Sequence, residues 1–136
     1  MNNYIGFFKL RFLCIILFIF SCSSSNNVDN IITYDMLMNG YTGKGTYIYD
    51  DSSKYVGEYL NGMRHGDGIY SYTDGEMYEG QFKYDKKHGK GKYSYSTGES
   101  YEGEYKNDMM HGYGVYTFSD GKILEGEWER AVFKGK

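Results

Sequence analysis

Polar and apolar residues alternate in short stretches over most of this chain. In YEGEYK (residues 101–106) the two tyrosines and the glycine fall on one face of a strand, and the two glutamates fall on the other. In GVYTF (residues 114–118) the glycine, the tyrosine and the phenylalanine share a face in the same way. A period of two is typical of β-strands, in which successive side chains point to opposite sides. The pattern therefore predicts a sheet with one aromatic face and one polar face.

These stretches recur in units of equal length. Three full units without insertions occupy residues 55–77, 78–100 and 101–123, a half unit (residues 42–54) precedes them, and another half unit (residues 124–136) follows. Within a unit, the link NDMMHG carries turn-forming residues and the motif SDG provides a short return turn. Each unit is therefore predicted to be a β-hairpin. Stacked hairpins predict an all-β fold, a single-layer antiparallel meander of about eight strands.

The glycines are placed as regularly as the units. The chain has 19 Gly and 17 Tyr and no Pro. A glycine inside a strand normally weakens the strand, but here it leaves space into which neighbouring rings can lean and pack edge to face. We therefore predict a structural role for the mid-strand glycines: Gly57, Gly68, Gly80, Gly91, Gly103, Gly114 and Gly126.

The sequence YEGEYK followed by HGYGVY resembles the MORN repeat, whose core reads Y-x-G-x-W/Y and continues as H-G-x-G-x-Y. The resemblance covers residues 42–136, which we take as the repeat domain. The first half unit has Thr42 where the full units have histidine, and the last half unit stops where its second strand should begin. Such atypical end units are typical of capping repeats. MORN-like proteins are generally regarded as adaptors, so the resemblance implies a non-enzymatic interaction module.

The N-terminal segment has a different character. Lys9 and Arg11 precede an apolar run from Phe12 to Phe20, and this run is too short for a comfortable membrane span. Residues 1–21 are therefore predicted to be a secretory signal peptide. The junction IFSC resembles the lipobox of bacterial lipoproteins, which implies that Cys22 becomes the first mature residue and carries a lipid. An uncleaved N-terminal anchor is the alternative.

Either alternative places the repeat domain outside the cytoplasm. We expect a lipid-anchored protein of the bacterial cell envelope, on the periplasmic face or the cell surface. Residues 22–41 are predicted to form a polar tether and an N-terminal cap, in which Ile31, Ile32, Met36 and Leu37 can cover the first strand.

Charge excludes one class of partner. The net charge is −3, and cleavage before Cys22 would make it more negative by removing Lys9 and Arg11. An acidic domain is a poor candidate for binding nucleic acid. Because Cys22 would be the only cysteine left, no disulfide is expected.

The three histidines raise the question of chemistry. His65, His88 and His111 each stand in a His-Gly-x-Gly motif, which is also found in the oxyanion-hole segment of lipases. The required Gly-x-Ser-x-Gly motif is absent from the sequence. Histidines of consecutive units should lie about 10 Å apart, since two strands separate them, whereas two ligands of one zinc ion lie within about 4 Å. We therefore expect each histidine to pack or to hydrogen-bond within its turn.

Other motifs give weak signals. The Gly-Lys-Gly and Gly-Asp-Gly sequences lack the spacing of a phosphate-binding loop. Glu58, Glu104 and Glu127 recur at one repeat position, with Gln81 in the second unit, and a solvated polar face explains them. No catalytic residue, metal site or cofactor is predicted.

Function is expected on the aromatic face, as an interaction or scaffold surface for a protein partner that the sequence does not identify. A contiguous exposed apolar patch usually marks such a surface. The predicted interaction face comprises Tyr55, Tyr59, Tyr70, Tyr72, Tyr78, Phe82, Tyr93, Tyr95, Tyr101, Tyr105, Tyr116, Phe118 and Trp128. The competing interpretation is that the sheet curls until these rings form its own core.

Two further possibilities stay open. Tyrosine rows also suit a glycan, and the basic stretch KYDKKHGKGK (residues 83–92) could receive a lipid headgroup, so a ligand-binding module is the alternative function. An open sheet edge at Trp128 would permit end-to-end pairing of two copies.

Overall fold

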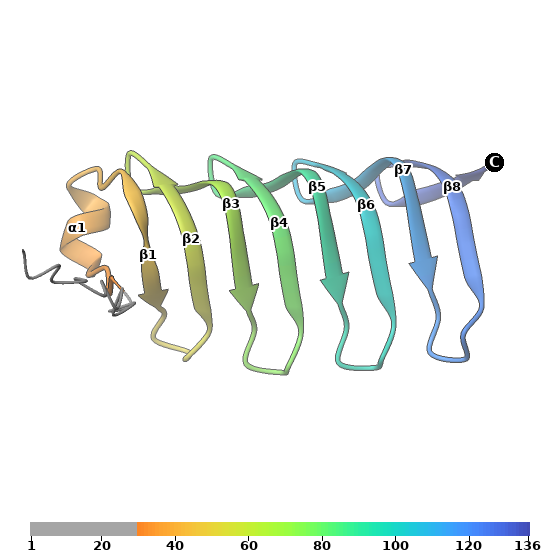
Figure 1. Cartoon of the computed structure of the whole chain (residues 1–136), viewed down its shortest axis with the longest axis horizontal. Helices are drawn as coiled ribbons and strands as arrows, with labels where there is room; N and C mark the ends of the chain where they lie inside the picture. The colour runs from red at the N-terminus through yellow and green to blue at the C-terminus, as the bar shows by residue number, and fades with distance from the viewer. Residues whose placement is uncertain (1–29) are drawn as a thin grey trace, which may run out of the picture.

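The structure, a computed structural model, describes residues 30–136, so the predictions for the signal peptide and for Cys22 lie outside the described residues. Strands lie side by side in chain order and form one antiparallel sheet, with a short helix beside the first strand (Figure 1). The bounds are Tyr34–Met38 (α1), Gly43–Ile48 (β1), Lys54–Leu60 (β2), Met63–Ser71 (β3), Met77–Lys83 (β4), Lys86–Ser94 (β5), Ser100–Lys106 (β6), Met109–Thr117 (β7), Ile123–Glu129 (β8) and Val132–Gly135 (β9). The predicted all-β meander is confirmed. It has nine strands instead of about eight, because Val132–Gly135 pairs with β8.

Tight turns join the two long strands of each hairpin. Two-residue turns link β2 to β3, β4 to β5, β6 to β7 and β8 to β9, and both residues of each turn have positive φ. Such turns match the twist of paired strands but disfavour residues other than Gly and Asn. In the β4–β5 turn, Asp85 donates its N–H to the carbonyl of Arg64 at 2.9 Å, and its carboxylate accepts the N–H of Arg64 at 2.9 Å. The second residues of the other turns donate in the same way to carbonyls earlier in the chain, those of Tyr41, Lys87 and Met110, and these bonds help to hold the turns.

The His-Gly motif does not form a turn, and this prediction was wrong. His65, His88 and His111 lie inside β3, β5 and β7. The glycine after each histidine has a φ between 58° and 62°, and the strand register shifts at this point. Between the paired positions on either side, the strand with the motif has two residues more than its partner, which makes a β-bulge. The motif therefore bends each hairpin and does not close it.

The mid-strand glycines pair with one another across the sheet. Gly57 faces Gly68, and the same pairing continues through Gly103 and Gly114. The ring of Tyr101 lies over this last pair: a Cβ atom on Gly114 would come within 2.2 Å of the Tyr101 hydroxyl. Tyr55 and Tyr78 lie over the preceding glycines in the same way. The glycines therefore make room for tyrosine rings, as the sequence predicts.

The hydroxyls of these three tyrosines satisfy carbonyl groups near the bulges. Tyr55 donates to the carbonyl of Glu58 at 3.0 Å, and Tyr101 donates to that of Glu104 at 3.1 Å. Tyr78 makes the equivalent bond to Gln81 at 2.9 Å. A bulge interrupts the regular pairing of backbone groups, so these hydrogen bonds explain why tyrosine is preferred to phenylalanine at this position.

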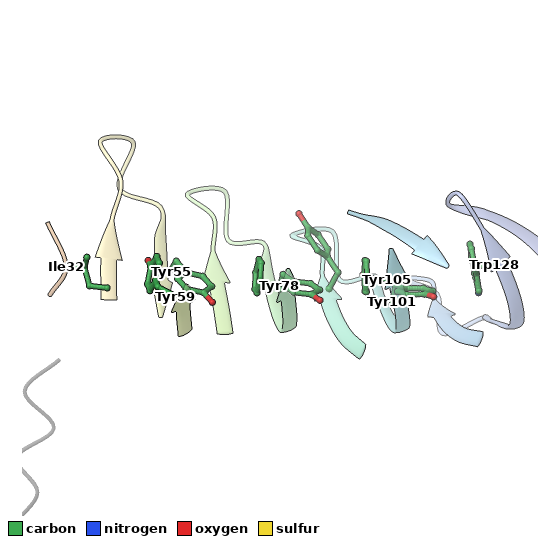
Figure 2. Close-up of a cluster of buried hydrophobic side chains, with 9 residues drawn as sticks. Ile32, Tyr55, Tyr59, Tyr78, Tyr101, Tyr105 and Trp128 are labelled. Atoms are coloured by element: carbon green, nitrogen blue, oxygen red, sulfur yellow. The ribbon is translucent and has the colours of Figure 1, made fainter. Parts of the chain in front are cut away.

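Nine rings form a continuous inner chain along the sheet. Neighbouring ring centroids are 5.0 to 6.0 Å apart, and most pairs meet edge to face. In order, the inner chain consists of Tyr41, Tyr59, Tyr55, Phe82, Tyr78, Tyr105, Tyr101, Trp128 and Phe133. Figure 2 shows its buried members strung along the sheet, with Ile32 at the N-terminal end. This chain is the hydrophobic core of the domain.

The segment before β1 closes one end of the sheet. Ile32 donates its N–H to the carbonyl of Thr46 at 2.8 Å, and Thr46 donates to the carbonyl of Asn30 at 2.7 Å. Ile32 is buried over Gly45, while Met36 and Leu37 pack against the core. Of the four predicted capping residues, only Ile31 points away, with 53% of its surface exposed.

The space above the glycine row can be tested by substitution. Gly103→Val is expected to lower the free energy of unfolding by about 1–3 kcal/mol, because a side chain there overpacks the interior. A Cβ atom would lie 2.5 Å from the Gly114 Cα atom and 2.7 Å from the Tyr101 hydroxyl. Urea denaturation measures the change. Glu102→Val is the matched control, since it adds the same residue to the opposite, exposed face of β6 and should change stability by less than about 0.5 kcal/mol. Equal stabilities of the two variants would contradict this account.

Candidate functional site

A second row of rings runs beside the inner chain, and it is half-exposed. We call it the outer ladder: Tyr47, Tyr49, Tyr70, Tyr72, Tyr93, Tyr95, Tyr116 and Phe118. Consecutive centroids are 4.5 to 6.0 Å apart. All members except Tyr93 remain partly accessible. Aromatic rings of this kind combine a large apolar area with a polar edge, which suits both packing and solvent contact.

The structure divides the predicted interaction face in two. Eight of its members are buried in the core and present little surface to a partner: Tyr55, Tyr59, Tyr78, Phe82, Tyr93, Tyr101, Tyr105 and Trp128. Tyr70, Tyr72, Tyr95, Tyr116 and Phe118 are half-exposed members of the outer ladder. The rings of the inner chain therefore form the core of the sheet itself, as the competing interpretation holds. Only the outer ladder is left as a candidate surface.

Two cations lie over the aromatic face. The guanidinium carbon of Arg64 is 5.1 Å from the centroid of Tyr70 and 5.4 Å from that of Phe82. The ammonium of Lys87 is 4.3 Å from the centroid of Tyr93 and 5.4 Å from that of Tyr78. Rings attract cations placed over their faces at such distances.

These cations differ in their other partners. Arg64 forms an ion pair with Asp85 at 3.2 Å, whereas Lys87 has no carboxylate within ion-pair distance among residues 30–136. Burial lowers the pKa of Lys87, although Asp108 and Glu76 act in the opposite direction. Sequence reasoning missed Arg64, and it included Lys87 only in the basic stretch of residues 83–92 without placing it over the rings. Both residues stand at one repeat position, directly before a histidine, and this recurrence was the available signal.

Carboxylates line the same face at the far ends of the strands. Tyr93 donates its hydroxyl to Glu76, and Tyr116 donates to Glu99 at 2.8 Å. Burial raises the pKa of the Tyr116 hydroxyl to about 12, and the hydrogen bond to Glu99 adds to the effect. In the preceding half unit, Ser53 takes the equivalent place and lies 2.9 Å from the Tyr70 hydroxyl. The outer ladder is therefore an apolar strip with acidic side chains along one margin.

The histidines lie away from this ladder, towards the tight turns. The ring of His65 packs against that of Tyr84 at 5.0 Å. The Nδ1 atoms of His65 and His88 are buried without a hydrogen-bond partner. Within the part of the chain that the structure describes, no group of three or more His, Cys, Asp or Glu residues could hold a metal ion.

The recurrent acidic position has a structural partner. Gln81 accepts the N–H of Lys90 at 3.0 Å, and its side chain lies against Gly89. Glu58 and Glu104 lie against Gly66 and Gly112 in the same way. These side chains cover the bulge glycines, so their recurrence reflects the bulge and not a paired acid–base site.

A shallow groove of about 740 Å³ runs along the opposite, polar face. The backbone of the glycine row forms its floor, and its walls carry charges of both signs, including Lys90, Lys92, Glu102 and Glu104. Lys92 and Glu102 approach each other to 4.0 Å. This mixture offers no continuous charged or apolar strip, in contrast to the outer ladder.

Comparison with protein-family models gives one match, to the MORN repeat, at residues 38–54, 55–77, 78–100 and 101–123. The chain therefore belongs to the MORN-repeat family, whose repeats are generally non-catalytic interaction modules. Among curated proteins, no sequence matches the chain. In residues 30–136, no helix is long and apolar enough to cross a membrane.

Proposed function

We propose that the protein is a non-enzymatic interaction or scaffold module that presents the outer ladder to a protein partner. The observation that carries this proposal is the ladder itself, a continuous row of rings that crosses every full unit and in which all members except Tyr93 are partly exposed. An apolar strip of this length on a folded domain is costly to leave in water and is typical of an interaction surface. The general role of MORN repeats supports the proposal.

The proposal includes a membrane tether. It rests on the lipobox-like sequence around Cys22 and on the apolar run before it. A lipid on Cys22 would hold the repeat domain in the cell envelope, outside the cytoplasm. Replacement of Cys22 by serine should then release the protein from the membrane fraction and abolish lipid labelling.

Capture of a partner from native membranes tests the interaction face. Full-length protein should retain one protein saturably, and the double substitution Tyr72→Ala and Tyr95→Ala should abolish its retention. Both rings are half-exposed, so the core remains intact. Tyr113→Ala is the matched control, because Tyr113 is an exposed tyrosine on the polar face, 49% accessible and bonded to Glu125 at 2.9 Å. Loss of retention with Tyr113→Ala alone would move the interaction to the polar groove and refute the proposal.

Binding of a lipid headgroup or a glycan is the alternative function. The basic stretch from residue 83 to 92 is split in the structure, since Lys83 and Lys86 are exposed while Lys87 lies over the rings. Loss of liposome binding on Lys83→Glu with Lys86→Glu would favour the headgroup. Displacement of the partner by a soluble glycan would favour the sugar.

The proposal also includes end-to-end pairing of two copies. Trp128 is 6% exposed and is not at the edge, which corrects the predicted position. In the part of the chain that the structure describes, the edge strand is β9, whereas the outer side of β1 is bonded to residues 30–32. An unpaired strand edge is a template for another strand, so β9 is where such pairing would occur.

A further inference from the structure

One arrangement of three rings occurs three times on the aromatic face. The first cluster consists of Tyr55, Tyr70 and Phe82, the second of Tyr78, Tyr93 and Tyr105, and the third of Tyr101, Tyr116 and Trp128. In the third cluster the Trp128 centroid is 5.3 Å from that of Tyr101 and 6.2 Å from that of Tyr116. The three clusters occupy equivalent positions in successive units, so what lies over each can be compared directly.

Among the residues that the structure describes, a cation lies over the first two clusters only. The Arg64 guanidinium lies within 5.9 Å of all three ring centroids of the first cluster. The Lys87 ammonium lies within 5.9 Å of all three centroids of the second. In the third cluster, Met110 stands at the position equivalent to Lys87. Met110 pairs with Tyr105 across the strands, just as Lys87 pairs with Phe82. Among residues 30–136, no basic side chain lies over the third cluster.

The third cluster nevertheless keeps the features that favour a cation. Trp128 has the most electron-rich ring system of any side chain and gives the strongest cation–π attraction. The carboxylate of Glu99 accepts the Tyr116 hydroxyl at 2.8 Å and forms no ion pair within the described residues. In the second cluster the equivalent carboxylate, Glu76, accepts the hydroxyl of Tyr93, the ring over which the Lys87 ammonium lies. The third cluster therefore has a carboxylate, that of Glu99, but no basic side chain of the described residues over its rings.

We propose that the third cluster binds a lysine or arginine side chain of the protein partner. This side chain displaces Met110 and places a cation over the three rings, as Arg64 and Lys87 do in the first two clusters. This inference rests on the proposed function of the aromatic face. Charge complementarity with Glu99 selects a basic side chain, and the flexible, unbranched side chain of Met110 can move aside without breaking a hydrogen bond. Met110 packs against the core while remaining partly accessible.

Trp128 reports on this site directly, because it is the single tryptophan of the chain. The probe is the peptide acetyl-Gly-Lys-Gly-amide, added to the full-length protein at constant ionic strength, and the neutral control is the same peptide with an Nε-acetylated lysine. The emission of Trp128 should change saturably with the charged peptide and should not respond to the neutral one. An equal response to both peptides would overturn the proposal.

Three variants separate the contributions. Met110→Lys fills the third cluster as Lys87 fills the second, so it should abolish the response; a retained response would overturn the proposal. Glu99→Gln should weaken binding about fivefold or more through loss of a charge-assisted contact. Glu76→Gln is the matched control in the self-filled second cluster and should leave the response unchanged. Because Glu99→Gln keeps the shape of the side chain, it still tests the site if Met110→Lys folds poorly.

The outcomes also distinguish this inference from the proposed function. If the Tyr72 and Tyr95 substitutions abolish partner capture but Trp128 does not respond to the charged peptide, the interaction face stands and the cation site is wrong. If Trp128 responds but no partner depends on the ladder, the proposed function fails instead. Saturation by tetramethylammonium chloride without any response to the lysine peptide would indicate a quaternary ammonium ligand and would refute a protein side chain as occupant.

Discussion

Raising the pH above about 10 is expected to unfold this domain cooperatively, because most of its core consists of tyrosine. Burial raises the pKa of the Tyr101 hydroxyl to about 12. Burial raises the pKa values of five other buried tyrosines further: Tyr55, Tyr59, Tyr78, Tyr93 and Tyr105. Above the ordinary tyrosine pKa of 10.0, the unfolded chain loses these protons while the folded chain keeps them. The folded state then binds more protons, so stability falls as the pH rises.

The size of the effect follows from the number of rings. Each such tyrosine lowers the free energy of unfolding by about 1.4 kcal/mol for each pH unit above its unfolded pKa. Six together remove about 8 kcal/mol per unit, which is comparable with the whole stability of a typical domain. The transition should therefore be complete within about two units above pH 10. Lys87 acts in the opposite direction, since burial lowers its pKa and favours the folded state as the pH rises towards 10.5, but it is a single group against six.

Circular dichroism and tyrosinate absorbance, followed together, measure this transition. Most of the absorbance change should coincide with the loss of sheet structure, since the buried hydroxyls cannot ionise before unfolding. A gradual rise in absorbance with an ordinary pKa, while the sheet signal is unchanged, would show that the rings are solvated and would refute the buried core.

Tyr101→Ala is expected to lower the free energy of unfolding by about 3–5 kcal/mol, as for other large-to-small aromatic substitutions in a core. Tyr101 is fully buried and joins Tyr105, at 5.2 Å, to Trp128, at 5.3 Å. Its removal interrupts the inner chain and leaves a cavity over Gly103 and Gly114. Urea denaturation gives the stability. The fluorescence emission of Trp128 in the remaining folded protein should shift to longer wavelength as its ring becomes exposed to water.

Tyr101→Phe separates the ring from its hydroxyl. It retains the packing but leaves the carbonyl of Glu104 without the hydrogen bond from Tyr101, which should cost about 1–3 kcal/mol. Tyr113→Ala removes a tyrosine from the exposed polar face and should cost less than about 0.5 kcal/mol. A loss below about 1 kcal/mol for Tyr101→Ala would contradict the view that the inner chain is the core of the domain.

The position of the bulge could not be predicted from local sequence. His111 and Gly112 follow turn-forming residues, and a glycine with positive φ serves equally well in a turn or in a bulge. The distinction depends on the partner strand: Gly103 faces Gly114 and Glu104 faces His111, so two extra residues, Gly112 and Tyr113, must be absorbed between them. Pairing of this kind is a property of two strands together.

The tight turns could not be predicted from local sequence for a related reason. Arg130 and Ala131 have positive φ but carry none of the usual signals of a two-residue hairpin turn. The pairing of β8 with β9 and the hydrogen bond from Ala131 to the carbonyl of Met110, at 2.9 Å, hold this conformation. Tertiary contacts here outweigh local preference, which explains why β9 was not expected.

The sequence by itself determined the strands, their order in a meander and the aromatic face, because alternation and an exact repeat are local properties that any pairing of equal units must respect. Only the tertiary structure decided which rings are core and which are surface. Tyr101 and Tyr116 are both aromatic, lie on the same face and recur in every unit, yet one is fully buried and the other half-exposed. The difference arises because Tyr101 lies across a pair of glycines that face each other only in the assembled sheet. The same assembly placed Arg64 and Lys87 over two clusters of rings, whereas Met110 occupies their repeat position at the third cluster.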